Sequence, residues 1–130
     1  MRVLILSTSD LQGGASRAAF RIHQGLLGIG LDSRLLVQKK TSDQSTVLAP
    51  EGRFAEFNSL ARQYLDALPL RGYKSRLLTN WSPAWWPSRI HRRIAREAPD
   101  VINVQWICEG FLPVRSLGRM RRPLVMTLQD

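Results

Sequence analysis

The sequence predicts an α/β protein with a Rossmann-like, mainly parallel sheet flanked by helices. Its first 38 residues follow the order strand, glycine turn, helix, strand, which is the order and size of one βαβ unit. Residues 3–6 form a continuous apolar run, as expected of a strand buried on both faces of a parallel sheet. Strand-like and helix-like patterns then alternate to residue 128, which is typical of α/β folds.

The first half of the chain contains three predicted strands and two predicted helices. Strands are expected at residues 2–7 and 33–38, with a short third one at 46–48. A helix at 15–29 connects the first two strands, and Gly30 is placed to end it. A second helix is expected at 53–68, ended by Pro69. The helical period predicts these core-facing residues in the first helix: Ala15, Ala19, Ile22, Leu26 and Ile29.

The second half begins with an irregular segment, residues 70–87, that mixes cationic side chains with tryptophan and proline. A basic helix is expected at 88–98, with Ser88 as its N-cap. Strands are expected at 101–106 and 124–128. Between them, Pro113 is expected to open a short helix that ends near residue 120.

Length and composition exclude several classes of protein. One hundred and thirty residues suffice for one domain with a real core, and 44% hydrophobic against 22% charged residues excludes a disordered tail. No apolar run reaches the roughly 20 residues of a membrane span. A single cysteine, Cys108, forms no internal disulfide and no zinc site. We therefore expect a cytoplasmic protein, with peripheral attachment at the inner membrane face as a further option.

The chain is strongly basic, with a formal net charge of +9. Sixteen of its 19 cations are arginine, the better residue for two-pronged contacts with phosphate or carboxylate. This charge suits nucleic acid, anionic lipid or an anionic substrate, and it equally fits a coding bias with solvated side chains. The same two readings apply to the arginine face of the helix at 88–98.

Ligands of open α/β sheets bind at the carboxyl ends of the strands, and there the clearest candidate is the first turn. Gly13 and Gly14 allow the backbone to approach a ligand closely, and the free N–H groups of the following helix can hold an anion. Arg17, one turn into the helix, would add positive charge. The spacing matches neither the dinucleotide fingerprint nor a P-loop, so a plain tight turn is the alternative.

Other chemistry-bearing residues give weaker signals. His23 and His91 have no partner at metal-ligand spacing and are expected to be packing or surface residues, and Cys108 is expected to be an inert thiol. The tryptophans of the 70–87 segment are expected to cover the core beneath a loop; the alternatives are stacking on sugars or bases and lying at a membrane interface.

Several short motifs, in order, resemble the N-terminal half of family 4 glycosyltransferases with the GT-B fold. They cover essentially the whole chain and lie at residues 7–10, 13–19, 32–40, 82–85, 99–103, 106–107 and 127–130. The resemblance implies a two-domain enzyme in which this half binds the acceptor. The other half would bind a nucleotide sugar and carry paired glutamates, and no cofactor or metal would be obligatory.

The resemblance implies that the chain is part of a glycosyltransferase that uses a nucleotide sugar. Such an enzyme would act on a glycan or lipid-linked acceptor in the assembly of a polysaccharide or glycolipid. Catalytic residues are not assigned and no metal ligand is expected. The substrate-binding candidates are Asp10, Gly13, Gly14, Arg17, Trp106, Gln129 and Asp130. Glutamine stands at positions 105 and 129, where members of the family often have histidine, and glutamine carries no proton or charge near neutral pH.

The chain ends after a strand, so we expect residues 1–130 to be a single truncated domain that lacks the donor-binding domain. Such a chain is expected to be inactive alone and to associate through an exposed sheet edge. The alternative function is a non-catalytic basic module that binds nucleic acid or an anionic membrane. A dinucleotide-binding protein is disfavoured, because Gln38 and Lys39 stand where a ribose-binding acid is expected.

Overall fold

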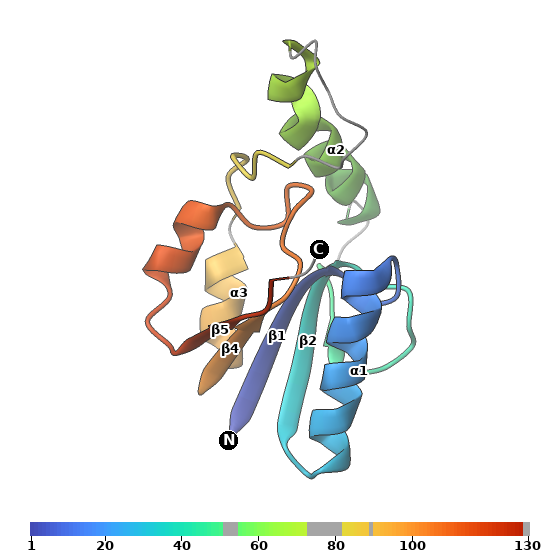
Figure 1. Cartoon of the computed structure of the whole chain (residues 1–130), viewed down its shortest axis with the longest axis vertical. Helices are drawn as coiled ribbons and strands as arrows, with labels where there is room; N and C mark the ends of the chain where they lie inside the picture. Colours follow the sequence, from blue (N-terminus) through green and yellow to red (C-terminus); the bar gives the residue numbers. More distant parts are fainter. Residues whose placement is uncertain (51–54, 73–81, 89, 129–130) are drawn as a thin grey trace.

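The computed structural model describes residues 1–50, 55–72, 82–88 and 90–128. Its centre is a five-stranded sheet in the order β3-β2-β1-β4-β5, in which every neighbouring pair is parallel (Figure 1). The α/β class and the parallel sheet predicted from the sequence are therefore confirmed.

The strands lie where the hydrophobic runs predict them, with ends shifted by one or two residues. Strand β1 spans Arg2–Ser9, β2 spans Asp32–Lys39 and β3 spans Val47–Leu48. The later strands are shorter than expected, since β4 spans Val101–Val104 and β5 spans Leu124–Met126. Strand β1 is central because its alternate side chains are buried on both faces of the sheet.

Helices cover both faces and give a three-layer architecture (Figure 1). Helix α1, Gly14–Gly28, packs Ala19 and Phe20 against the face that carries Val3 and Ile5. The opposite face is covered by helix α3, Ile90–Glu97, and by the 3-10 helix η2, Val114–Arg119. Pro113 precedes this segment as predicted, although the segment is a 3-10 helix.

The predicted core face of α1 is only partly right. Ala19 is buried and Leu26 is partly buried, but Ile22 is exposed and Ile29 is 73% exposed. Ser16 and His23 are buried instead, so the inward face is rotated toward polar side chains. Gly30 ends the helix as predicted, with φ of +80° and its N–H donating to the carbonyl of Leu27.

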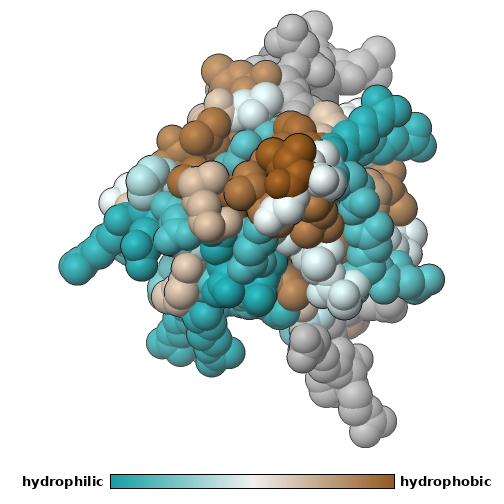
Figure 2. Space-filling model, turned by 90° about the horizontal axis from the view of Figure 1, so that it is seen from below, coloured by the Kyte–Doolittle hydropathy of each residue, from teal (hydrophilic) through white to brown (hydrophobic). Residues whose placement is uncertain are grey.

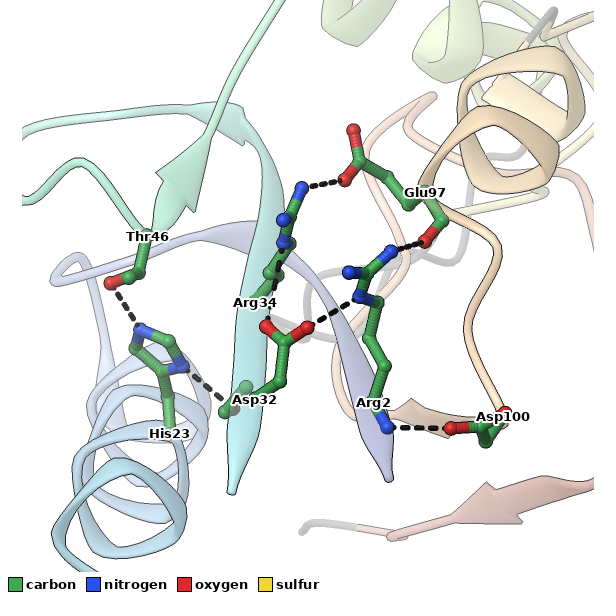
Figure 3. A network of polar contacts seen from close by, with 8 residues as sticks. Arg2, His23, Asp32, Arg34, Thr46, Glu97 and Asp100 are labelled. Atoms are coloured by element: carbon green, nitrogen blue, oxygen red, sulfur yellow. Dashed lines mark hydrogen bonds and ion pairs between the residues drawn. The ribbon is translucent and has the colours of Figure 1, made fainter. Parts of the chain in front are cut away.

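His23 is fully buried because both ring nitrogens have hydroxyl partners (Figure 3). Its Nδ1 lies 2.8 Å from Ser33 Oγ on β2, and its Nε2 lies 2.9 Å from Thr46 Oγ1, just before β3. The ring therefore connects the first helix to two strands. Its expected packing role is confirmed, and His91 is exposed.

The buried ring of His23 makes stability depend on pH. Burial lowers its pKa below the ordinary 6.5, and both hydrogen-bond partners are neutral hydroxyls. The unfolded chain therefore takes up its proton first as the pH falls below 6.5. We expect the free energy of unfolding to decline from pH 7 toward pH 5 in urea titrations. The variant His23→Gln should lack this decline, and equal slopes for both proteins would contradict the expectation.

Helix α3 carries the arginine face expected from the sequence. Ser88 Oγ accepts a hydrogen bond from the N–H of Ile90 at 3.3 Å, which caps the helix start. Ile94 faces the core, whereas Arg92 and Arg96 are exposed. Arg93 is the exception on the cationic face, because it is half-buried and donates to the carbonyl of Ala49 at 2.6 Å.

Helix α2, Ala55–Ala67, lies beyond the carboxyl ends of the strands and continues as the 3-10 helix η1, Leu68–Gly72 (Figure 1). Proline at position 69 therefore converts the helix to the tighter form and does not end it outright. None of the helices within the described residues is long and apolar enough to cross a membrane.

The amino end of the sheet is held by charged side chains. Arg2 Nε pairs with Asp32 at 2.5 Å, and Arg34 pairs with Glu97 at 2.5 Å, so β1, β2 and α3 are tied together (Figure 3). Seen from below, hydrophilic side chains project around this end of the molecule and hydrophobic atoms gather between them (Figure 2).

Strand β5 forms one edge of the sheet, and all three of its residues are exposed. An exposed sheet edge left by truncation was expected from the sequence, and within the described residues β5 has one neighbour, β4. Association through it stays a prediction.

Candidate functional site

The candidate site is the carboxyl edge of the parallel sheet, where the polar turns that follow the strands converge. Strand β1 leads into the turn before α1, and β2 leads into the loop before β3. The β4 end leads into residues 105–113, which lie beneath α2. Five fully or nearly buried polar side chains line this edge: Thr8, Ser9, Asp10, Gln38 and Gln105.

The turn between β1 and α1 leaves the helix start open. Gly13 has φ of +85° and occupies the N-cap position, and no side-chain cap bonds the helix start within the described part of the chain. Gly13 and Gly14 are exposed, and a Cβ built on either would meet no described atom within 4 Å. The first N–H groups of an α-helix have no partner within the helix, and the positive end of its dipole lies at this turn.

Arg17 and Ser9 shape this turn from either side. The exposed Arg17 folds back so that its Nε donates to the carbonyl of Leu11 at 3.3 Å, which places the guanidinium beside the turn. Ser9 Oγ lies 2.8 Å from Ser16 Oγ and accepts from the N–H of Gln12. The backbone around the glycines is thus fixed by the ends of β1 and α1.

Asp10 has a structural role in this arrangement. It is 0% exposed, and its carboxylate accepts hydrogen bonds from the N–H groups of Thr41 and Ser42 at 3.0 and 2.8 Å. Burial alone would raise the pKa of Asp10, but these amide hydrogen bonds hold it below its ordinary value. A substrate reaches this carboxylate only by displacing the loop, so the structure places Asp10 as a clamp between β1 and that loop.

The end of β4 is tied to its neighbours on both sides. The carbonyl of Trp106 accepts from the N–H of Thr8 at 2.6 Å, and its side chain is half-buried. Gln105 is buried, and its amide nitrogen donates to Asn103 Oδ1 and to Thr127 Oγ1, beyond β5. Gln105 therefore serves here as a polar connection between strands.

A second polar cluster lies between α2 and the 82–88 segment. Asp66 is 2% exposed and accepts a hydrogen bond from Ser82 Oγ at 2.5 Å, and Ser82 Oγ accepts from the N–H of Glu109. Burial, reinforced by the nearby carboxylates of Asp66 and Glu109, raises the pKa of the Cys108 thiol. A raised pKa disfavours the nucleophilic thiolate, in agreement with the expected inert thiol.

The sequence-predicted candidates meet only in part. The structure brings Gly13, Gly14 and Arg17 together at one turn, with Asp10 buried beneath it and Trp106 at the end of β4. Gln129 and Asp130 lie outside the described residues, as do Trp81 and Arg89. No group of three metal-ligating side chains is found in the described ranges.

The sequence pattern did not single out the side chains that hold the loops in place. Ser9 joins the end of β1 to the turn before α1 and to Ser16. Gln38 joins the end of β2 to the carbonyl of Glu109, and Ser82 joins Asp66 of α2 to the N–H of Glu109. The sequence does show single polar residues at strand ends, and such ends converge in a parallel sheet. It does not show which residues they contact, because the partners are distant in sequence; Gln38 and Glu109 are 71 residues apart.

Neither the scan of protein-family models nor the searches of curated proteins and of solved structures found a match for this chain.

Proposed function

We propose that this chain forms the acceptor-side lobe of a nucleotide-sugar-dependent glycosyltransferase of the GT-B type, which assembles a polysaccharide or glycolipid. The observation that carries the proposal is the open glycine turn of α1 at the carboxyl edge of an all-parallel sheet, beside Arg17. Such a turn suits the phosphates of a nucleotide sugar or of a phosphate-linked acceptor. The ordered motifs that resemble family 4 glycosyltransferases support the same assignment.

The described residues offer no catalytic group at this turn. Asp10 is engaged by backbone amides, and the pKa of Cys108 is raised, so neither is prepared as a base or a nucleophile. We therefore expect binding of the anionic group without turnover by these 130 residues alone. Transfer of sugar from a nucleotide sugar by the purified chain would contradict the expectation that these residues bind without turnover.

Titration with a nucleoside diphosphate, followed by amide NMR, tests the phosphate site. We expect selective shifts at Gly13, Gly14 and the next two amides. Arg17→Ala should weaken binding about fivefold, because one charge–phosphate contact at an exposed helix start is lost. The control Arg21→Ala removes an exposed charge one turn further along α1 and should leave the affinity unchanged. The proposal would be wrong if the amide shifts were spread over the basic surface and were equal in the two variants.

The alternative is a non-catalytic basic module that binds nucleic acid. The exposed Arg92 and Arg96 on α3 favour it, together with the exposed cations Arg119, Arg121 and Arg122. Binding to duplex DNA through these side chains would weaken steeply with salt. Failure to bind duplex DNA at low salt would remove this alternative.

A further inference from the structure

The loop between β2 and β3, residues 40–46, contains only polar and charged side chains. Apolar burial, which holds most segments of a folded chain in place, therefore contributes little to the position of this loop. Its two ends are fixed by the sheet. Strand β2 pairs with β1 as far as Lys39, and Val47, the first residue of β3, is 2% exposed in the core. The loop is thus a polar segment between two fixed points.

The first part of the loop is held by a carboxylate. Asp10, directly after β1, accepts hydrogen bonds from the N–H groups of Thr41 and Ser42 at 3.0 and 2.8 Å. Burial alone would raise the pKa of Asp10, but the hydrogen bonds from Ser42 and Thr41 outweigh burial and lower it. Asp10 therefore holds the loop as an anion. Opening the loop would bring this fully buried carboxylate to the surface at the carboxyl edge of the sheet.

The last part of the loop is held by a buried imidazole. His23 on α1 has its Nε2 2.9 Å from Thr46 Oγ1 and its Nδ1 2.8 Å from Ser33 Oγ on β2 (Figure 3). Beside it on α1, Gln24 Nε2 donates to Gln44 Oε1 at 2.6 Å, in the middle of the loop. Because burial lowers the pKa of His23, the ring binds a proton less readily with the loop in place than after its release.

The charged groups around these contacts do not stabilise a protonated ring. Lys40 and Asp43, the charged side chains of the loop itself, are exposed, and Lys40 Nζ donates to a carbonyl within the loop. Lys39, at the end of β2, is also exposed. The hydroxyl partners of His23 and the tilted ring of Phe20 are uncharged. Proton uptake in place would therefore leave a buried cation that no described carboxylate pairs with.

We propose that residues 40–46 form an acid-sensitive gate over Asp10, which opens as one unit while the sheet stays folded. Opening frees His23 to take up a proton as the pH falls below its ordinary value of 6.5, so acid favours the open loop. Below the ordinary value of 3.8 for Asp10, protonation of that carboxylate acts in the same direction. The inference is independent of the proposed transferase activity.

Amide hydrogen exchange of the whole chain at pH 7 and pH 5, corrected for the intrinsic effect of pH, tests the gate. The probes are the amides of Thr41 and Ser42, which bond to Asp10 at the opposite end of the loop from His23. Their protection should fall about tenfold, since one group with an ordinary pKa of 6.5 allows at most about 25-fold. Amides of Ile5 and Leu6 in β1 should stay about a hundredfold better protected at both pH values.

Three variants separate the gate from a general effect of pH. His23→Gln keeps a hydrogen-bonding side chain that takes up no proton, so the protection of Thr41 and Ser42 should become independent of pH over this range. The control His91→Gln removes an exposed imidazole on α3 and should leave the pH dependence as in the parent. Gln24→Ala removes the middle contact and should lower the protection of both amides about threefold at either pH.

An unchanged pH dependence in His23→Gln would overturn the proposal, because the two ends of the loop would then open separately. Equal protection of the loop amides and the β1 amides would also overturn it, since the loop would then open only when the whole chain unfolds. Circular dichroism checks that each variant is folded. If His23→Gln does not fold, Gln24→Ala decides, and unchanged protection at Thr41 and Ser42 in that variant would refute opening as one unit.

Discussion

Replacing Asp10 by alanine is expected to lower the free energy of unfolding at pH 7 by about 2–4 kcal/mol. The substitution leaves the N–H groups of Thr41 and Ser42 without their buried acceptor, and each hydrogen bond to a charged group contributes about 1.5–3 kcal/mol. The loop after β2 should then loosen. Urea titration measures the loss, and amide exchange at Thr41 and Ser42 locates it.

The pH dependence of stability distinguishes loss of the Asp10 hydrogen bonds to the loop from a general packing effect. The pKa of Asp10 is lowered in the folded chain, so its stabilisation is present above the ordinary value of 3.8 and is lost as the pH falls through the folded value. The difference in the free energy of unfolding between the parent and Asp10→Ala should therefore become smaller in acid. Asp43→Ala is the matched control, because this exposed carboxylate lies in the same loop and should change stability by less than about 0.5 kcal/mol. A similar loss from both substitutions would contradict the clamp.

Gly110→Ala is expected to destabilise the chain by about 3 kcal/mol and to displace α2. Gly110 has φ of +73°, which costs about 1–2 kcal/mol for any residue with a Cβ. The added Cβ would also lie 2.7 Å from the carbonyl oxygen of Arg62, and this backbone atom cannot rotate away. Thermal unfolding measures the loss, and changed amide shifts along α2 report the displacement.

Gly25→Ala is the control for this substitution. Gly25 is exposed inside α1, and an added Cβ meets no described atom within 4 Å, so alanine should be neutral or stabilising by up to about 1 kcal/mol. If Gly110→Ala behaved in the same way, the close approach between α2 and residues 109–110 would be refuted.

The sequence predicted the sheet well because apolar runs report burial directly. All five strands lie within one or two residues of the predicted segments, since a strand such as β1 has both faces buried. It predicted helix faces less well. Ile22 in α1 and Ile29 just after it are exposed, while His23 is buried because Ser33 and Thr46 satisfy its ring. Helical period alone cannot reveal that compensation.

Only the part of the candidate site that lies within one local segment could be predicted from the sequence. The turn at Gly13 and Gly14 was found because glycine between a strand and a helix is a local signal. The burial of Asp10 depends on amides more than 30 residues away, and no spacing rule reports such a contact. Phe57, Leu60 and Tyr64 of α2 have helical spacing and are exposed, and spacing alone does not say whether such residues face the core or the solvent.

The polar mounting of α2 has a consequence for how the molecule folds. Its described contacts with the body include hydrogen bonds from Gln38, Arg62 and Gln63, whereas α1 and one face of the sheet share an apolar cluster. Apolar burial supplies most of the cooperativity of a domain, and regions with little of it open at lower free energy. We therefore expect α2 to open at a lower free energy than the sheet and α1 do.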